Sequence, residues 1–308
     1  MHLIRKMAKD RGYAWVVCLA SFFIYIICDG IGMSFGVFVP YIKKNLGTTT
    51  SQAGFIGSLH IGLCYLTAPF NIALAKTFGY RKMSVVGAIA VTGALFAAGQ
   101  TSTLLSMTLA YGLFASLGIC MIITTAELAT NEYFDAKRSL ANGIVFSGSS
   151  VGYFVSAPIL TYILEKHGLQ TGFIVEGSVT ALCILLGFLL KTYEGNEELV
   201  TSKASLGDRL KLSMYDMMER DVLFDKGFLL YSVGRVFNYL PLIVPLIYMP
   251  SMLSESGKGI SQMEAGLSIT IIGICNLCGR LMCGLLDKYP NLVIKAGFFV
   301  GLKFQIKF

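Results

Sequence analysis

The chain has 308 residues, of which 55% are hydrophobic and only 14% are charged. Soluble domains carry about a quarter charged residues, so this composition excludes an ordinary soluble protein and favours a lipid bilayer. The formal net charge is +7. Because no basic run or aromatic stacking motif accompanies that charge, it predicts no nucleic-acid partner, and it is typical of Lys and Arg residues in cytoplasmic loops.

Apolar stretches long enough to cross a bilayer follow one another along the chain. A transmembrane helix needs about 20 mostly apolar residues, and the sequence has six such stretches, a polar gap, two more and an interrupted ninth. This pattern predicts an all-α polytopic membrane protein with a six-helix first lobe and an incomplete second lobe. The predicted parts are a cytoplasmic N-terminus at 1–13, the six-span lobe at 14–190, a cytoplasmic linker at 191–226 and a partial second lobe at 227–308.

Lys and Arg residues predict the orientation. With the N-terminus inside, the inner segments carry 16 of these residues and the outer loops carry four. Cytoplasmic loops hold the excess of basic residues in membrane proteins. The N-terminus and the linker are therefore expected in the cytoplasm.

Two segments carry specific motifs. Residues 10–17 read DRGYAWVV and resemble, with departures at two positions, the first signature of the monocarboxylate transporter family. Residues 133–144 read YFDAKRSLANGI and, with Gly148 and Gly152 after them, closely match the second signature of that family. The glycines are spaced for close helix packing. The chain thus resembles a truncated member of the less-studied, non-lactate branch of the monocarboxylate transporters.

The resemblance implies a major facilitator fold, in which two lobes rock about a central path. It implies transport of a small organic monocarboxylate or a related zwitterion, with no cofactor and no metal. No nucleotide-binding loop or nucleophile elbow supports an enzyme. The family also implies the plasma membrane and, as a partner, a single-span ancillary glycoprotein. The alternative is a non-transporting fragment, because four of twelve expected spans are missing or incomplete. Proton or sodium coupling stays open.

Ionisable residues inside spans are functional candidates because a bilayer makes them costly. Arg280 stands in the eighth span where, by resemblance, the family's arginine receives the substrate carboxylate, and a guanidinium can donate two parallel hydrogen bonds to that group. Asn276 stands one turn earlier, where proton-coupled members have an acid. Met33 stands where those members have a lysine. Both departures argue against proton-linked lactate transport.

Asp29 in the first span has two interpretations. It either binds a cationic group of the substrate or forms an ion pair with Arg280 or Arg235 that has no substrate contact. Arg235 in the seventh span carries the same two interpretations. Nearby, Gly32 and Gly36 are expected to form a close-packing face of the helix.

Several other residues are candidates for narrower roles. Arg81 lies in a segment that resembles a degenerate inner gating loop without its usual Asp, and Lys137 with Arg138 forms the basic pair of the second signature. These three are predicted gating or ion-pair residues. His60 is expected to form a hydrogen bond between helices, with proton movement as the alternative. Glu176 is expected at the membrane interface, near the outer end of the sixth span.

Overall fold

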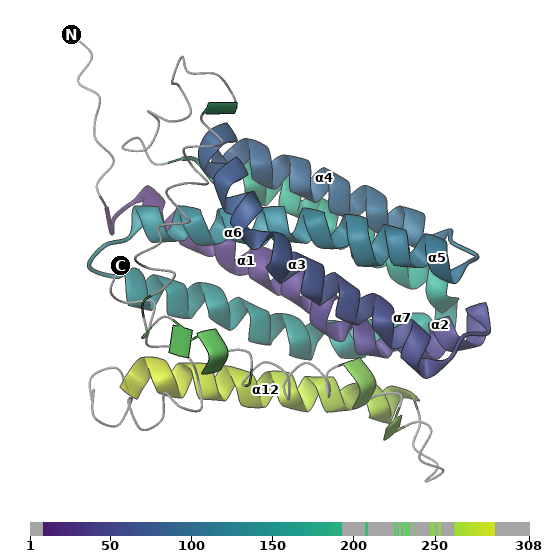
Figure 1. Cartoon of the computed structure of the whole chain (residues 1–308). Helices are drawn as coiled ribbons and strands as arrows, with labels where there is room; N and C mark the ends of the chain where they lie inside the picture. Colours follow the sequence, from purple (N-terminus) through teal and green to yellow (C-terminus); the bar gives the residue numbers. More distant parts are fainter. Residues whose placement is uncertain are drawn as a thin grey trace.

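The computed structural model describes residues 9–192, short pieces between 207 and 253, and the helix at 262–286, with side chains of that helix described only as far as 278. These residues form a bundle of long helices, without a strand among them (Figure 1). The predicted all-α membrane fold is confirmed. Most of the predicted linker and of the second lobe lies outside the described residues.

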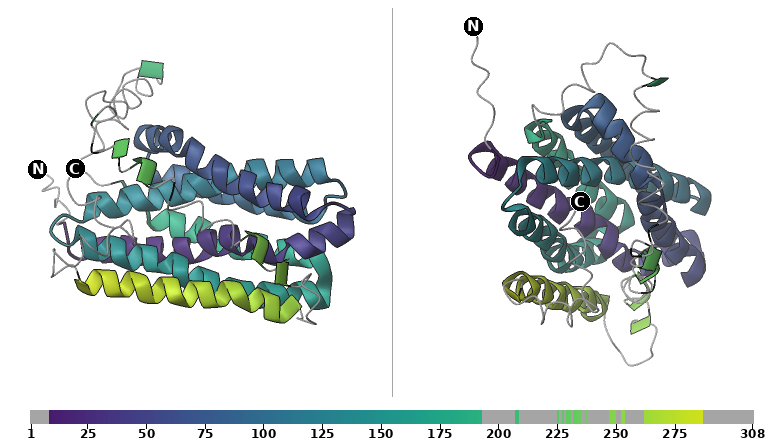
Figure 2. Two further views of the ribbon diagram at one scale, coloured as in Figure 1. Left: turned by 60° about the horizontal axis from the view of Figure 1, so that its bottom comes forward. Right: turned by 60° about the vertical axis from the view of Figure 1, so that its left-hand side comes forward.

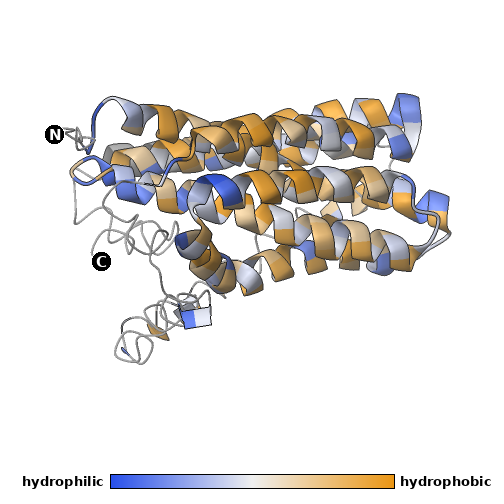
Figure 3. Ribbon diagram, turned by 90° about the horizontal axis from the view of Figure 1, so that it is seen from above, coloured by the Kyte–Doolittle hydropathy of each residue, from blue (hydrophilic) through white to orange (hydrophobic). Residues whose placement is uncertain are grey.

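The helices follow the apolar stretches of the sequence. Their bounds are α1 (Tyr13–Ser34) with the 3₁₀ turn η1 (Phe35–Val37), α2 (Val39–Leu46), α3 (Thr50–Phe78), α4 (Tyr80–Gly99), α5 (Leu104–Met107), the π-helix η2 (Thr108–Ala115), α6 (Ser116–Tyr133), α7 (Arg138–Leu189) and α12 (Gln262–Leu286). Within the described ranges, five helical stretches are long and apolar enough to cross a membrane. Hydrophilic residues gather near the helix ends, as the two ends of a bilayer span require (Figure 3).

The longest helix, α7, contains a break. It has 52 residues, and Gly168 interrupts it with non-helical backbone angles of φ 79° and ψ 179°. Glycine adopts such angles without the steric cost that a Cβ imposes. Gly172 packs against Leu164 across this break, where an added Cβ would lie 2.7 Å from the leucine side chain. The chain therefore turns back at Gly168, and α7 provides a first leg before this residue and a second leg after it.

The first leg of α7 packs closely along α1. A Cβ added at Gly148 would lie 2.5 Å from the carbonyl oxygen of Phe22, and one added at Gly152 would lie 2.4 Å from that of Ile26. Real Cβ atoms do not approach this closely, so only glycine fits at both positions. The close helix approach predicted from the second motif is confirmed.

The tight position on the facing helix differs from the prediction. A Cβ at Gly30 would lie 2.5 Å from Oγ of Ser156, whereas one at Gly32 would have an ordinary contact of 3.7 Å with the ring of His60. The prediction of a close-packing face at Gly32 is therefore wrong, because the face that meets α7 passes through Gly30. Helical periodicity alone did not say which of the neighbouring glycines faces the partner.

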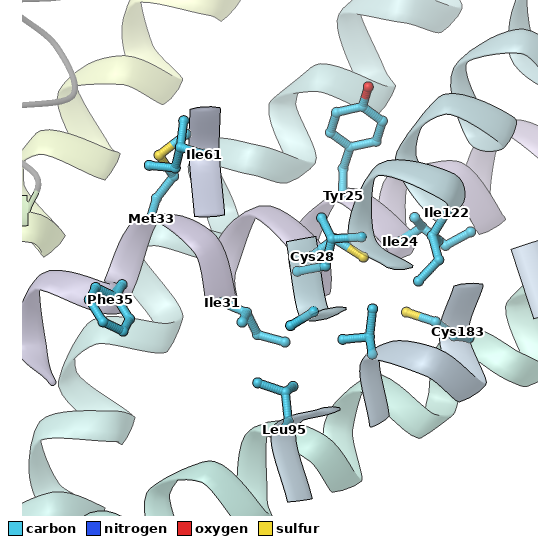
Figure 4. Close-up of a cluster of buried hydrophobic side chains, with 14 of the residues drawn as sticks. Ile24, Tyr25, Cys28, Ile31, Met33, Phe35, Ile61, Leu95, Ile122 and Cys183 are labelled. Atoms are coloured by element: carbon cyan, nitrogen blue, oxygen red, sulfur yellow. The ribbon is translucent and has the colours of Figure 1, made fainter. Parts of the chain in front are cut away.

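Two further contacts place the elements that matter for the site. On α1, Ile31 is directed toward Leu95, on the opposite side of the helix from Met33 (Figure 4). Helix α12 lies alongside the first leg of α7 (Figure 2). They meet at Gly273, where a Cβ would lie 2.8 Å from the backbone nitrogen of Phe154. The first leg of α7 is thus held between α1 and α12.

Candidate functional site

Consecutive serines on the first leg of α7 connect it to both neighbouring helices. Oγ of Ser149 donates a hydrogen bond of 2.5 Å to Oδ2 of Asp29 on α1. Oγ of Ser150 donates one of 2.9 Å to Oδ1 of Asn276 on α12. Neighbouring residues on a helix point about 100° apart, so the two serines reach different partners. Two of the predicted site residues are therefore held at one level of the bundle, on either side of α7.

The helix that carries Asp29 changes geometry just beyond it. Oγ of Ser34 donates a hydrogen bond to the carbonyl oxygen of Gly30, and the chain continues into the 3₁₀ turn η1. Asp29 is half-buried, and Met33, four residues later, is buried. Met33 lies next to Ile61 of α3 (Figure 4). The position where the resemblance expects a lysine thus holds an apolar side chain against α3.

The two predicted arginines are only partly placed. Arg280 belongs to α12, one turn after Asn276, so both residues lie on the same side of that helix. The side chain of Arg280 and the whole of Arg235 lie outside the described residues. The predicted ion pairs of Asp29 with these arginines therefore stay predictions.

The contact between α1 and the first leg of α7, called the seam from here on, joins the two sequence motifs at the end that holds the N-terminus of α1. Oδ1 of Asp10 accepts hydrogen bonds from the backbone N–H groups of Asp135 at 3.1 Å and Lys137 at 2.9 Å, and Oδ2 accepts one from Ala136 at 3.2 Å. The backbone N–H of Asp10 donates to the carbonyl of Tyr133 at 3.0 Å. These bonds, that from Lys137 above all, lower the pKa of the Asp10 carboxyl from its ordinary value of 3.8. The first motif thus serves as a clamp on the loop that begins the second.

The basic candidates line this clamp. Nζ of Lys137 lies 5.9 Å from the centre of the Trp15 ring, and Nε of Arg138 donates a 3.1 Å hydrogen bond to the carbonyl of Phe134. The rings of Trp15 and Phe134 meet edge to face, with their centres 5.1 Å apart. Arg81 is exposed at the start of α4 and interacts electrostatically with Tyr13. These contacts stabilise the seam, and a gating role for Arg81, Lys137 and Arg138 stays a prediction.

Two further residues with predicted roles, His60 and Glu176, are buried in the bundle. Nδ1 of His60 lies 3.0 Å from the carbonyl oxygen of Tyr111, and Oγ of Ser116 donates a 2.6 Å hydrogen bond to the His60 carbonyl. The predicted hydrogen bond between helices is confirmed. Glu176 is only 3% exposed, so it is buried within the bundle, and its place at the level of the membrane interface stays a prediction. Its buried neighbour Phe173, three residues earlier on the same helix face, was the sequence signal for burial.

The serines are the functional residues that sequence reasoning missed. Serine is common in membrane helices as a packing residue, and nothing in its spacing distinguishes Ser149 and Ser150 from the other small residues around them. The distinguishing feature is what faces them, and that depends on the crossing of three helices. No group of His, Cys, Asp and Glu that could hold a metal ion occurs within the described residues.

Known proteins resemble this chain over most of its length. The family model of the Major Facilitator Superfamily matches residues 18–303. Monocarboxylate transporter 4 of Gallus gallus is 24% identical over 90% of this chain and 58% of its own length, and monocarboxylate transporter 3 of Rattus norvegicus is 26% identical over 92% and 57%. The chain therefore spans less than two thirds of the length of these relatives.

Solved structures of transporters share the fold. The partially occluded inward-open xylose transporter XylE from E. coli superposes with a TM-score of 0.65 at 12% identity, over 90% of this chain and 74% of that one. The peptide transporter POT in complex with sulfate gives a TM-score of 0.59 at 12% identity, over 95% and 72%. At this level of identity the likeness establishes the arrangement of helices and says nothing of the cargo.

Proposed function

The chain belongs to the major facilitator superfamily, and we propose that it carries a small organic monocarboxylate or a related zwitterion across a membrane by alternating access. The family assignment made from the motifs is confirmed, and the relatives are multi-pass membrane transporters rather than enzymes. The observation that carries the proposal is the pair of serine bonds by which α7 holds Asp29 and Asn276 at one level between three helices.

Each residue of this site has a chemical task in the proposal. Arg280, one turn beyond Asn276 on α12, receives the substrate carboxylate through its planar guanidinium. Asn276, fixed by Ser150, offers a neutral hydrogen-bonding group beside it. Asp29, oriented by Ser149, offers a negative charge to a cationic group. An amide on α12 and Met33 on α1 lack the charges expected of a lactate carrier, which supports a different carboxylate or a zwitterion.

The proposal includes an orientation and a location. The end of the bundle that holds Tyr13 also holds Arg81, Lys137 and Lys191, the last with Nζ 5.4 Å from the centre of the Tyr13 ring. A concentration of basic groups at one end of the spans supports a cytoplasmic N-terminus. We also propose, from the resemblance of the two motifs to the family signatures, a plasma-membrane location and a single-span glycoprotein partner.

Reconstitution of the purified 308-residue chain in lipid vesicles tests this function. We expect saturable uptake, in counterflow, of labelled members of a panel of monocarboxylates and zwitterions. Arg280→Lys keeps the charge but loses the two-pronged fork, and Arg280→Gln loses both, so uptake per copy should fall in that order. Arg11→Gln, an exposed residue at the inner end, serves as the matched control. Unchanged uptake per copy by Arg280→Gln excludes this arginine as the substrate anchor.

The second candidate is a form that does not transport. The chain spans 58% and 57% of the length of the two transporters above, so uptake is measured on the 308-residue chain itself. In the same vesicles a folded chain without saturable uptake of any panel member supports this candidate. Saturable uptake by the wild-type chain contradicts it.

A further inference from the structure

Glu176 is a buried acid that the proposed substrate site does not use. It lies on the second leg of α7, about two turns after the break at Gly168. Neither of its carboxylate oxygens has a hydrogen-bond partner among the described residues, and its side chain is 3% exposed. An ionised carboxylate without partners is among the costliest groups to bury, at several kcal/mol or more. This position therefore requires a second species that neutralises the acid.

The described neighbours of Glu176 are aromatic. A Cβ on the adjacent Gly177 would lie 2.8 Å from the ring of Phe96 on α4, and Phe173 stacks on Phe38 with ring centres 4.5 Å apart. The described neighbours of Glu176 thus supply aromatic rings and no hydrogen bond to its carboxylate, and a proton neutralises the acid without a further partner.

Tyr111 is the titratable group that interacts with Glu176. The two are linked by an electrostatic interaction, and the Tyr111 hydroxyl donates a 3.3 Å hydrogen bond to the carbonyl of Ile31 on α1. Ile31 lies two residues before Met33. His60, the titratable group that faces Tyr111 from α3, has its ring centre 4.7 Å from the tyrosine ring. These residues form a buried connection from Glu176 to the part of α1 that carries the proposed substrate site.

The backbone at Tyr111 provides a second, independent observation. Tyr111 lies in η2, a stretch of π-helix. Such stretches are rare in proteins and occur often at functional sites, because the wider turn frees backbone groups for other partners. Here the carbonyl oxygen of Tyr111 lies 3.0 Å from Nδ1 of His60 on another helix. The geometry of the fourth span is thus adapted at Tyr111, whose ring centre lies 5.8 Å from that of Phe173, about one turn before the acid.

We infer that Glu176 is a proton-binding site of this protein and that Tyr111 connects it to α1 near Met33. A hydronium ion of the aqueous phase gives one proton to a carboxylate oxygen of Glu176 and becomes water, and the reverse step breaks the new O–H bond and returns the proton to water as hydronium. Asn276 and Met33 carry no ionisable group at the two positions where the resemblance expects an acid and a lysine, and Glu176 lies apart from both on the second leg of α7. Any use of this proton in transport rests on the proposed function, whereas proton binding itself does not.

Infrared spectroscopy of the 308-residue chain in lipid vesicles tests the site without any transport. We expect the C=O stretching band of a protonated carboxyl group at neutral pH in the wild type, its loss in Glu176→Gln and its retention in Glu165→Gln, an exposed acid of the first leg. Glu176→Asp should restore the band at a shifted frequency, which guards against a folding defect. A wild type without the band at neutral pH, or a Glu176→Gln variant that keeps it, overturns the inference.

Hydrogen–deuterium exchange of the same band tests the connection. After transfer into D₂O the shift of the band should be at least tenfold slower in Tyr111→Phe than in the wild type, because the substitution removes the hydroxyl and keeps the ring. Tyr25→Phe on α1 is the control and should exchange as the wild type does. Equal rates in Tyr111→Phe and the wild type exclude the tyrosine as the route. Vesicles that show the band but no substrate uptake count against the proposed function alone.

Discussion

Asp10 lies at the N-terminal end of the seam between α1 and α7, and Glu176 lies inside the same lobe, near the turn at Gly168. Three backbone N–H groups donate to the Asp10 carboxylate, whereas neither oxygen of Glu176 has a partner within the described residues. Both residues are acids of a membrane protein, yet only the first is supplied with hydrogen bonds to its charged form.

This difference in hydrogen bonding distinguishes an acid with a structural role from an acid with a functional role. A carboxylate that accepts several N–H bonds is stable as an anion and fixes the loop around it. A carboxyl group that is buried without partners reduces stability, and a protein retains such a group at sites that act. We therefore interpret Asp10 as a structural residue that stabilises the seam, and Glu176 as a functional residue. The substitutions below either break this comparison or sharpen it.

The largest effect is expected from a side chain placed in the seam itself. Gly152→Leu puts a branched side chain where even a Cβ would lie 2.4 Å from the carbonyl of Ile26. Overpacking costs about 3 kcal/mol or more at such a site, and we expect little correctly folded protein in size-exclusion chromatography. Gly143→Leu on the same leg is the control, because a Cβ there meets nothing within 4 Å. Equal yields of the two variants would show that the protein folds even when α1 and the first leg of α7 are pushed apart.

The next effect has the opposite sign. Glu176→Leu replaces a partnerless carboxyl by an apolar group, and relief of a buried unsatisfied group contributes about 1–3 kcal/mol. We expect a higher melting temperature in detergent together with loss of the protonated-carboxyl band. Glu165→Leu, at an exposed position, should leave the melting temperature unchanged. A lower melting temperature for Glu176→Leu would mean that the acid stabilises the lobe, which would put it in the same class as Asp10.

A smaller loss is expected at Asp10. Asp10→Asn keeps one acceptor oxygen and the backbone angle, φ 62°, that Asn tolerates, but it removes the negative charge that the N–H groups of the loop favour. We expect the melting temperature at neutral pH to fall by a few degrees. Because the folded pKa of Asp10 is lowered from 3.8, its stabilisation is complete above that value and is lost as the pH falls through the lowered one. The difference between wild type and variant should therefore disappear in strongly acidic buffer, and a difference that persists there points to a steric cause.

Some of the features compared above could be predicted from the sequence, and others could not. Apolar length predicted the helices, and the motif glycines Gly148 and Gly152 predicted close packing, because both depend on local composition and spacing. These properties do not depend on which helices become neighbours.

Tertiary neighbours were the part that could not be predicted. The bonds of Ser149 and Ser150 depend on α1 and α12 lying on either side of α7. Glu176 was placed at the interface because it lies near one end of its span, while its burial depends on α4 and η2 covering that face. The clamp at Asp10 joins residues more than a hundred positions apart, which no local pattern reveals.

The smallest effect is expected at Lys137, where backbone and side chain have separate roles. The backbone N–H donates to Asp10, and the exposed ammonium group lies over the ring of Trp15 at 5.9 Å. Lys137→Gln keeps the first contact and removes the second, which at an exposed site is worth about 0.5–1 kcal/mol. We expect a change in melting temperature below that of Asp10→Asn, with Lys82→Gln, another exposed inner lysine, as the control. If Lys137 gates the transport path, uptake per copy should change well beyond that of the control while stability barely moves, and the side chain would then belong with the functional residues and not with the seam.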